Sequence, residues 1–192
     1  MLDQLSMFGD STPAWPDGFR YENDLITPDD ERALLGEIRA LPFRAFEFHG
    51  YTGKRRVVSF GWKYDFETRA LDRVDNLPGW LLPLRAAAAR FAGLDAARLQ
   101  QALVTEYEAG AAIGWHRDKA VFGEVVGVSL LAPCTFRLRR ASGDGWDRVS
   151  LIAAPRSAYL LSGPSRTVWE HSIPAVEELR YSVTFRNLKS EG

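Results

Sequence analysis

The stretch that decides the fold is Arg180-Tyr181-Ser182-Val183-Thr184-Phe185-Arg186, in which polar and apolar residues alternate strictly. Successive side chains of a strand point to opposite faces, so the alternation predicts a strand whose four polar side chains share one face. If that face points outward, the segment is an ordinary amphipathic edge strand. If it lines a barrel, two guanidinium groups lie inside and need an anionic partner. A dicarboxylate would supply one carboxylate at each end, because arginine binds carboxylates through paired hydrogen bonds.

Further strand-like segments precede this one after about Leu99, where the helical period disappears. They are short, rich in Val, Leu, Thr and aromatic residues, and separated by turn residues such as Ser142-Gly143-Asp144-Gly145. With the last strand included, the expected segments are 102–108, 115–119, 124–131, 134–140, 148–154, 157–162, 167–172 and 179–187. Such a series of strands predicts a sandwich or jelly roll, the architecture that also hosts cupins.

Two helices are expected before these strands. Thr27 is a hydroxyl N-cap, Pro28 occupies the first helical position, and acidic residues follow in the first turn. The apolar stripe of this helix ends at Pro42. The second helix covers 78–91 and is closed by Gly93. We therefore expect an α+β, mainly β protein in which two N-terminal helices pack on the jelly roll.

The length of the chain favours one domain. A chain of 192 residues can bury a single substantial core, so we expect a single domain over 1–192. Within it we expect an N-terminal arm at 1–23, loosely ordered over the core, a helical and lid region at 24–98, and a jelly-roll catalytic core at 99–188.

Charge and cysteine content limit the classes of partner. The 24 basic and 25 acidic residues nearly cancel, so binding of nucleic acid would need a local basic patch. The single cysteine, Cys134, cannot form an internal disulfide, which favours a reducing compartment. The sequence has no signal segment and no apolar run of membrane-spanning length. We expect a soluble, cytoplasmic monomer without a membrane partner.

Residues 43–66 interleave aromatic residues with the basic run Lys54-Arg55-Arg56, and several glycines punctuate the segment. This composition favours hairpins or loops over a helix. A basic, aromatic surface of this kind could stack a flat substrate such as a nucleobase. An ordinary twisted hairpin, with its aromatic residues on the core and its charges in solvent, explains the same pattern because aromatic residues are enriched in strands.

His116 and Asp118 lie two residues apart on an expected strand, so their side chains share a face. An imidazole and a carboxylate are two of the three ligands of the facial triad that leaves positions open on a non-haem Fe(II). His171 is the only other histidine on an expected strand, because His49 lies beside Gly50 in a loop-like segment. The alternative is that His116 is a surface residue and His171 an ordinary core histidine.

These motifs, in this order, resemble the AlkB family of Fe(II)/2-oxoglutarate-dependent dioxygenases. The resemblance rests on Tyr107 and Gly110 upstream of the segment from Ile113 to Lys119, on Ser165-Arg166 followed by His171 and Ile173, and on the strand 180–186. It covers residues 103–187 and extends more loosely to 54–64.

The resemblance implies a double-stranded β-helix in which Fe(II) is bound by His116, Asp118 and His171. It implies that the cosubstrate 2-oxoglutarate is held by polar side chains of two strands, namely Arg180, Arg186, Tyr107, Ser182 and Thr105. It implies O2 as a further reactant. An aromatic and basic hairpin lid would contact the substrate through Arg55, Arg56, Phe60, Trp62 and Tyr64. Arg166, outside the lid, would contact the substrate as well.

The implied reaction is oxidative demethylation of an N-alkylated nucleobase in single-stranded or flipped-out DNA or RNA, with release of succinate, CO2 and formaldehyde. Two positions depart from the family pattern: Thr105 replaces an asparagine, and Ala120 replaces an acid found in the nucleic-acid repair members. The same chemistry on a protein or small-molecule substrate therefore remains an alternative. A catalytically inactive module that binds nucleic acid is another.

Overall fold

The computed structural model describes residues 15–48, 51–65 and 68–189. Its helices are α1 (Pro28–Ile38), α2 (Leu82–Ala92) and α3 (Gly163–Thr167), with the 3-10 turns η1 (Gly79–Leu81) and η2 (Ala96–Arg98). Its strands are β1 (Phe19–Glu22), β2 (Arg44–Phe48), β3 (Tyr51–Phe60), β4 (Trp62–Tyr64), β5 (Leu71–Arg73), β6 (Gln101–Tyr107), β7 (Ile113–His116), β8 (Phe122–Leu130), β9 (Cys134–Ser142), β10 (Gly145–Ala153), β11 (Ala158–Leu161), β12 (Glu170–Ile173) and β13 (Arg180–Leu188).

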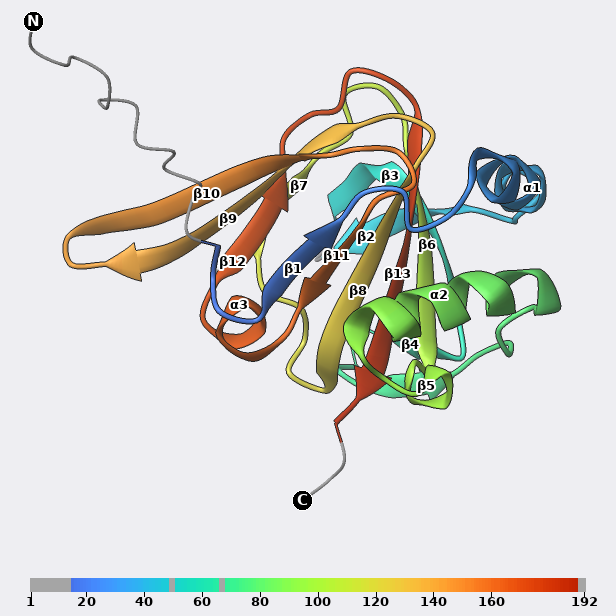
Figure 1. Ribbon diagram of the computed structural model, residues 1–192, viewed down its shortest axis with the longest axis horizontal. Helices are drawn as coiled ribbons and strands as arrows, with labels where there is room; N and C mark the ends of the chain where they lie inside the picture. Colours follow the sequence, from blue (N-terminus) through green and yellow to red (C-terminus); the bar gives the residue numbers. More distant parts are fainter. Residues whose placement is uncertain (1–14, 49–50, 66–67, 190–192) are drawn as a thin grey trace, which may run out of the picture.

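Two antiparallel sheets form the body of the molecule (Figure 1). The larger sheet has the strand order β1-β11-β8-β13-β6-β3-β2, and the smaller one has the order β10-β9-β12-β7. Strands β4 and β5 form a small separate sheet. Helices α1 and α2 lie on the side of the larger sheet that faces away from the smaller one. The expected jelly roll with two helices packed on it is therefore confirmed.

The burial pattern of β13 shows which face of the larger sheet packs against the helices. Its apolar residues Tyr181, Val183 and Phe185 are buried in one cluster with Leu35 of α1 and Leu84 of α2. Because side chains alternate along a strand, the polar residues of β13 point to the other sheet. The barrel-lining alternative for residues 180–186 is therefore the correct one.

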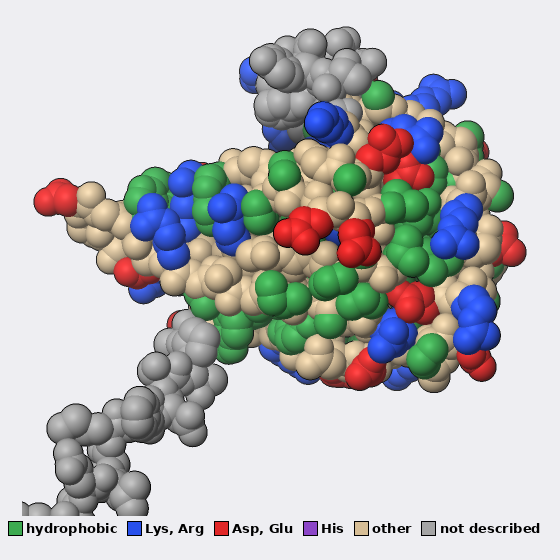
Figure 2. Space-filling model, turned by 90° about the horizontal axis from the view of Figure 1, so that it is seen from above, with side chains coloured by type: hydrophobic (Ala, Val, Ile, Leu, Met, Phe, Trp, Pro, Cys, Tyr) green, Lys and Arg blue, Asp and Glu red, His purple; other side chains and the backbone are tan. Residues whose placement is uncertain are grey.

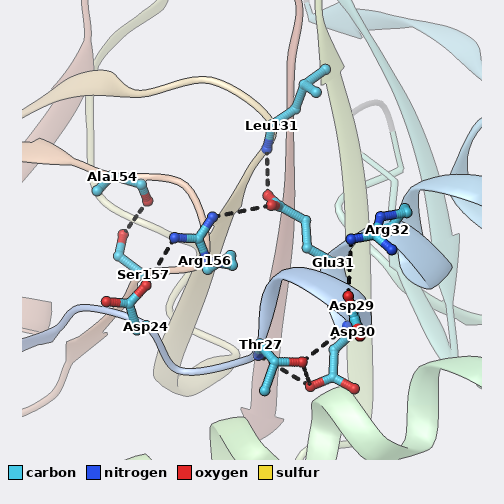
Figure 3. Close-up of polar contacts among 10 residues, drawn as sticks. All are labelled: Asp24, Thr27, Asp29, Asp30, Glu31, Arg32, Leu131, Ala154, Arg156 and Ser157. Carbon is cyan, nitrogen blue, oxygen red and sulfur yellow. Dashed lines mark hydrogen bonds and ion pairs between the residues drawn. The ribbon is translucent and has the colours of Figure 1, made fainter.

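Helix α1 begins where its capping residues predict. The Thr27 hydroxyl accepts a hydrogen bond from the Asp30 amide, and the Asp30 carboxylate accepts one from the Thr27 amide. Glu31 in the first turn accepts a hydrogen bond from the Leu131 amide at 2.8 Å and a weaker one from Arg156 at 3.4 Å (Figure 3). These contacts attach α1 to the end of β8.

The N-terminal arm is more ordered than its sequence predicts. Residues 19–22 form β1, which pairs with β11 at the edge of the larger sheet, and Phe19 is buried there opposite Leu161. The expectation of a loosely ordered arm is wrong for this segment. Its few residues pair with a strand far along the chain, so no local period marks them.

The expected lid is largely an edge of the larger sheet. Strand β3 pairs with β6 from Arg55 opposite Tyr107 to Phe60 opposite Ala102, and β2 pairs with β3. The tip of this hairpin, with His49, lies outside the described residues. No helix among the described residues is long and apolar enough to cross a membrane.

Candidate active site

The polar face of β13 forms the floor of the candidate site. Arg180, Ser182 and Arg186 are all buried, with Arg180 only 2% exposed. Ser182 lies between Thr105 of β6 and a serine of β8, so three hydroxyl-bearing residues stand side by side on the inner face. Thr105 is 2% exposed. The predicted cosubstrate residues of β6 and β13 are therefore brought to one face.

His116 and His171 are directly opposite each other on the paired strands β7 and β12. Their ring centroids are 4.3 Å apart. Asp118 follows two residues after β7 ends, so it lies just beyond the strand that was expected to carry it. Its Oδ2 is 3.7 Å from Nε2 of His171. The structure thus brings the three predicted metal ligands together.

Arg186 fixes the orientation of the Asp118 carboxylate. Its Nε and Nη2 both donate to Oδ1 of Asp118, at 3.1 and 2.7 Å, and its Nη1 donates to Gln101 at 2.9 Å. Oδ2 is left facing His171. Burial, the largest single influence, would raise the pKa of Asp118, but the surrounding cationic groups, Arg186 first among them, together outweigh it and hold that pKa well below its usual range. Asp118 is therefore an anion at any physiological pH.

Each histidine can present a ring nitrogen to a metal ion. Burial, reinforced by the nearby His116, lowers the pKa of His171 to about 3, so its ring carries no charge at neutral pH. Nδ1 of His116 lies 2.9 Å from the Gly114 carbonyl oxygen. A hydrogen bond from Nδ1–H to that oxygen leaves Nε2 of His116 free to bind a metal.

This set of donors fits iron. Two neutral imidazoles and one carboxylate are the ligands of non-haem Fe(II) sites. Two atoms that each bind a metal ion at about 2.1 Å lie at most ~4.2 Å apart, so the 3.7 Å between His171 and Asp118 is within reach of one ion. Among the described residues, no three His, Cys, Asp or Glu side chains are already arranged to coordinate one metal ion, so binding an ion requires the ligand side chains to move.

Arg180 forms the other end of the site. One of its nitrogens, Nη2, donates to Ser129 at 2.9 Å, and its guanidinium lies 4.5 Å from the centre of the Tyr107 ring. Its Nε and Nη1 are buried without a hydrogen-bond partner. None of the ion pairs found in the described part of the chain involves Arg180. A buried cation with unused donors fits an anionic ligand such as the carboxylate of 2-oxoglutarate.

The Tyr107 hydroxyl and the Ser182 hydroxyl lie 3.3 Å apart beside Arg180. They complete this polar end of the candidate site. Three further residues were not predicted: Ser129, which binds Arg180; Gln101, which binds Arg186; and Tyr159, which lies opposite Gly127 on the same inner face. Ser129 was detectable as a polar residue inside an apolar strand. For Gln101 and Tyr159 the sequence carries no comparable signal.

Two of the predicted substrate residues lie close to this face. Arg55 is opposite Tyr107 on β3, and its guanidinium lies 3.8 Å from the centre of the Phe46 ring. Burial lowers its pKa, and it lies within the electrostatic field of Asp118. The Tyr64 ring lies 5.2 Å from Nζ of Lys119, which follows Asp118 directly.

Arg56 and Phe60 are on the opposite face of β3, and their predicted contact with substrate is corrected. Nε of Arg56 donates to Glu106 at 2.7 Å on the helix side of the sheet. Phe60 belongs to the apolar cluster beneath the helices and packs edge-on against Trp80. Because side chains alternate, a strand that points Arg55 inward must point Arg56 outward.

Trp62 and Arg166 are also placed differently from the prediction. Trp62 lines a separate cavity of about 320 Å³, together with Arg73 and Arg85. Arg166 is 7% exposed and donates to the backbone carbonyls of Lys119, Phe122 and Gly123. Its contacts hold the loop after Asp118 in place, so Arg166 supports the position of Asp118 through the backbone.

The sequence matches the 2OG-Fe(II) oxygenase superfamily over residues 41–186. The Alkylated DNA repair protein ALKBH8 homolog of Arabidopsis thaliana is 29% identical over an alignment of 175 residues that covers 79% of this chain and 49% of that protein. The tRNA (carboxymethyluridine(34)-5-O)-methyltransferase alkbh8 of Xenopus tropicalis is 26% identical, over 84% of this chain and 26% of that protein. This chain thus spans about half of the first relative and a quarter of the second.

Solved structures share the fold. OsALKBH1 superposes with a TM-score of 0.69 at 16% identity, over 88% of this chain and 96% of that one. A prolyl hydroxylase from Trichoplax adhaerens superposes with a TM-score of 0.64 at 12% identity, over 89% of this chain and 83% of that one. At these identities the likeness concerns the fold alone.

Proposed function

The chain belongs to the 2OG-Fe(II) oxygenase superfamily and to its AlkB family, and on this premise we propose that it oxidises an alkyl group carried by a nucleobase of DNA or RNA. As a member it is a dioxygenase that uses Fe(II), 2-oxoglutarate and O2. The observation that carries the proposed site is the buried Arg180, whose two unpaired nitrogens lie on the same face of β13 as Arg186, the ion-pair partner of Asp118.

In the proposed site His116, Asp118 and His171 hold the iron, which supplies the oxidising chemistry together with O2 and 2-oxoglutarate. Arg180 binds the far carboxylate of 2-oxoglutarate through its Nε and Nη1, helped by the hydroxyls of Tyr107 and Ser182. Arg186 keeps one oxygen of Asp118 occupied, so that the other is directed at the ion.

Nucleobases are the proposed substrate class for two reasons. The names of the relatives cited above refer to alkylated DNA and to a tRNA uridine. Strand β3, beside Tyr107, also carries a guanidinium that lies over an aromatic ring, Arg55 over Phe46, and such pairs bind bases and phosphates. Oxidation of an N-methyl group inserts oxygen into a C–H bond, and the resulting hemiaminal releases formaldehyde and leaves an N–H on the base.

A second candidate is oxidation of a substituent attached through carbon to a tRNA uridine. Ala120 and the name of the Xenopus relative favour it, because Ala120 cannot supply the carboxylate that the repair members place there. A hydroxyl group placed on carbon is stable, so the product would keep the substituent and gain one oxygen atom without releasing formaldehyde.

The test is a mass-spectrometric screen of methylated single- and double-stranded DNA and RNA oligonucleotides and of tRNA, with Fe(II) and 2-oxoglutarate present. We expect succinate in every active reaction, with formaldehyde and loss of a methyl group for the first candidate, or a gain of one oxygen atom for the second. His116→Ala and Asp118→Ala should abolish both products, while Arg90→Ala, an exposed helix residue, should retain them. Succinate formation that persists in the first two variants would contradict the assigned site.

A further inference from the structure

The outer face of the smaller sheet carries interleaved arginine and tryptophan side chains. Arg137 and Arg139 of β9, Arg148 and Trp146 of β10, and Trp115 of β7 share this face, because Arg139 lies opposite Arg148 and His116 points to the inner face. We call these five residues the Arg/Trp face. Figure 2 shows basic and hydrophobic side chains alternating along the projecting β9–β10 hairpin.

Two of the arginines, Arg137 and Arg139, lie over indole rings. The Arg139 guanidinium lies 4.4 Å from the centre of the Trp115 ring and 4.0 Å from that of Trp146. Arg137 lies 4.9 Å from the Trp115 ring and donates to Ser172 at 3.0 Å. Cation–π contacts of this kind fix the long arginine side chains before any ligand arrives. Less conformational entropy is then lost when a ligand binds.

The charge on this face is incompletely balanced. Glu170 pairs with Arg139 at 2.7 Å. Arg137 and Arg148 take no part in the ion pairs found among the described residues, so the face keeps a net positive charge. Trp146 is 41% exposed, an unusual state for so large an apolar ring. A ligand that fits must be both anionic and flat.

We propose that the Arg/Trp face docks a single strand of nucleic acid that continues out of the active site. Unpaired bases present the flat faces and phosphates the negative charges that such a surface binds. The face begins at Trp115, directly before His116, and crosses four strands to β10. At about 4.8 Å per strand spacing this is a path of roughly 14 Å, enough for a short run of nucleotides beside the oxidised base. The inference rests on the proposed function, since the docked strand carries that base.

The experiment compares a long and a short fluorescein-labelled single-stranded RNA, about 16 and about 4 nucleotides long, which bracket the site sizes of small single-strand-binding domains. The full chain is titrated with each RNA and binding is followed by anisotropy at several salt concentrations. Trp146→Ala should weaken binding of the long RNA at least about fivefold, which corresponds to the loss of one stacked base. Arg148→Glu should weaken it further and lower the salt slope by about 0.7 for each phosphate that the protein no longer neutralises.

Two control variants separate this effect from general damage. Trp146→Phe keeps a flat ring and should restore binding of the long RNA. Arg90→Glu changes the charge by the same amount on α2, far from the Arg/Trp face, and should leave it unchanged. The short RNA should bind all four variants equally, because it does not reach the face.

The outcomes distinguish this inference from the proposed function. Succinate formation on the short RNA, if that RNA carries the modified base, should be equal in all variants. Unchanged binding of the long RNA to both Trp146→Ala and Arg148→Glu would overturn the docking inference, whatever the activity, and would point to an acidic protein partner instead. If the protein without substitutions oxidises none of the RNAs, the proposed function is contradicted, but the result for binding of the long RNA still stands.

Discussion

Arg180 and Arg186 lie at opposite ends of the polar face of β13, and they differ in what surrounds them. Arg186 donates to Asp118 and Gln101 with all three of its nitrogens. Arg180 uses one nitrogen on Ser129 and buries the other two without a partner. The same residue type on one strand therefore serves two purposes. Arg186, which is saturated in the sense that every nitrogen has a hydrogen-bond acceptor, orients a carboxylate of the protein. Arg180, which is unsaturated because two nitrogens have none, is available for a carboxylate of a ligand.

The largest effect is expected at the saturated end. Arg186→Met leaves the Asp118 carboxylate buried without its cation, which costs about 3–5 kcal/mol of unfolding free energy. Urea denaturation of the metal-free protein measures this loss. The double variant Arg186→Met with Asp118→Asn should lose less than the sum of the two single variants, because the unpaired charge is gone. Strict additivity would show that the pair is not coupled.

The unsaturated end should respond in binding and not in stability. Arg180→Met removes two buried donors that no protein group uses, at the cost of one hydrogen bond to Ser129, so the unfolding free energy should change little. The KM for 2-oxoglutarate should rise about 100-fold, equivalent to ~2.7 kcal/mol of lost charge-assisted hydrogen bonds. Steady-state succinate formation measures it. Arg148→Met, on the outer face, should leave this KM unchanged, and an equal rise there would refute the assignment.

Gln101 tests how far the saturation of Arg186 matters. Gln101→Leu removes the acceptor of Nη1 and leaves that buried donor unpaired, at a cost of about 1–3 kcal/mol. The two hydrogen bonds to Asp118 remain, so the KM for 2-oxoglutarate should change little. Urea denaturation and succinate kinetics on the same preparation separate the two readouts. A large rise in KM would show that Gln101 itself binds the cosubstrate.

Much of this contrast was predictable from the sequence, because period-two alternation identifies the residues that share a face. The shared face of β13 follows from this alternation and the two helices follow from their caps and helical period, whereas the full set of three ligands was predicted from the resemblance to the AlkB family. Alternation does not reveal which face points inward, so Arg55 and Arg56 were treated alike although they lie on opposite sides of β3. Contacts set by long-range register, such as that between Arg186 and Gln101, have no local signature.

The smallest effect is expected between the two arginines, at Tyr159. The register places Tyr159 opposite Gly127, which is itself opposite Thr184 of β13. Burial of its hydroxyl raises the pKa of Tyr159 well above its ordinary value. The folded state therefore holds this proton more tightly than the unfolded state, where the pKa is about 10. Its contribution to stability is complete below that pH and is lost as the pH rises further.

Tyr159→Phe removes this titration. Between about pH 8 and pH 11 the unfolding free energy should fall less steeply in the variant than in the parent protein, with a difference below about 1.4 kcal/mol per pH unit for the single proton involved. Tyr181 and Cys134, whose pKa values are also raised by burial, titrate in both proteins and cancel in the comparison. Parallel pH profiles would mean that the Tyr159 hydroxyl is hydrated, and that the space between Arg180 and Arg186 is open to water and not shielded.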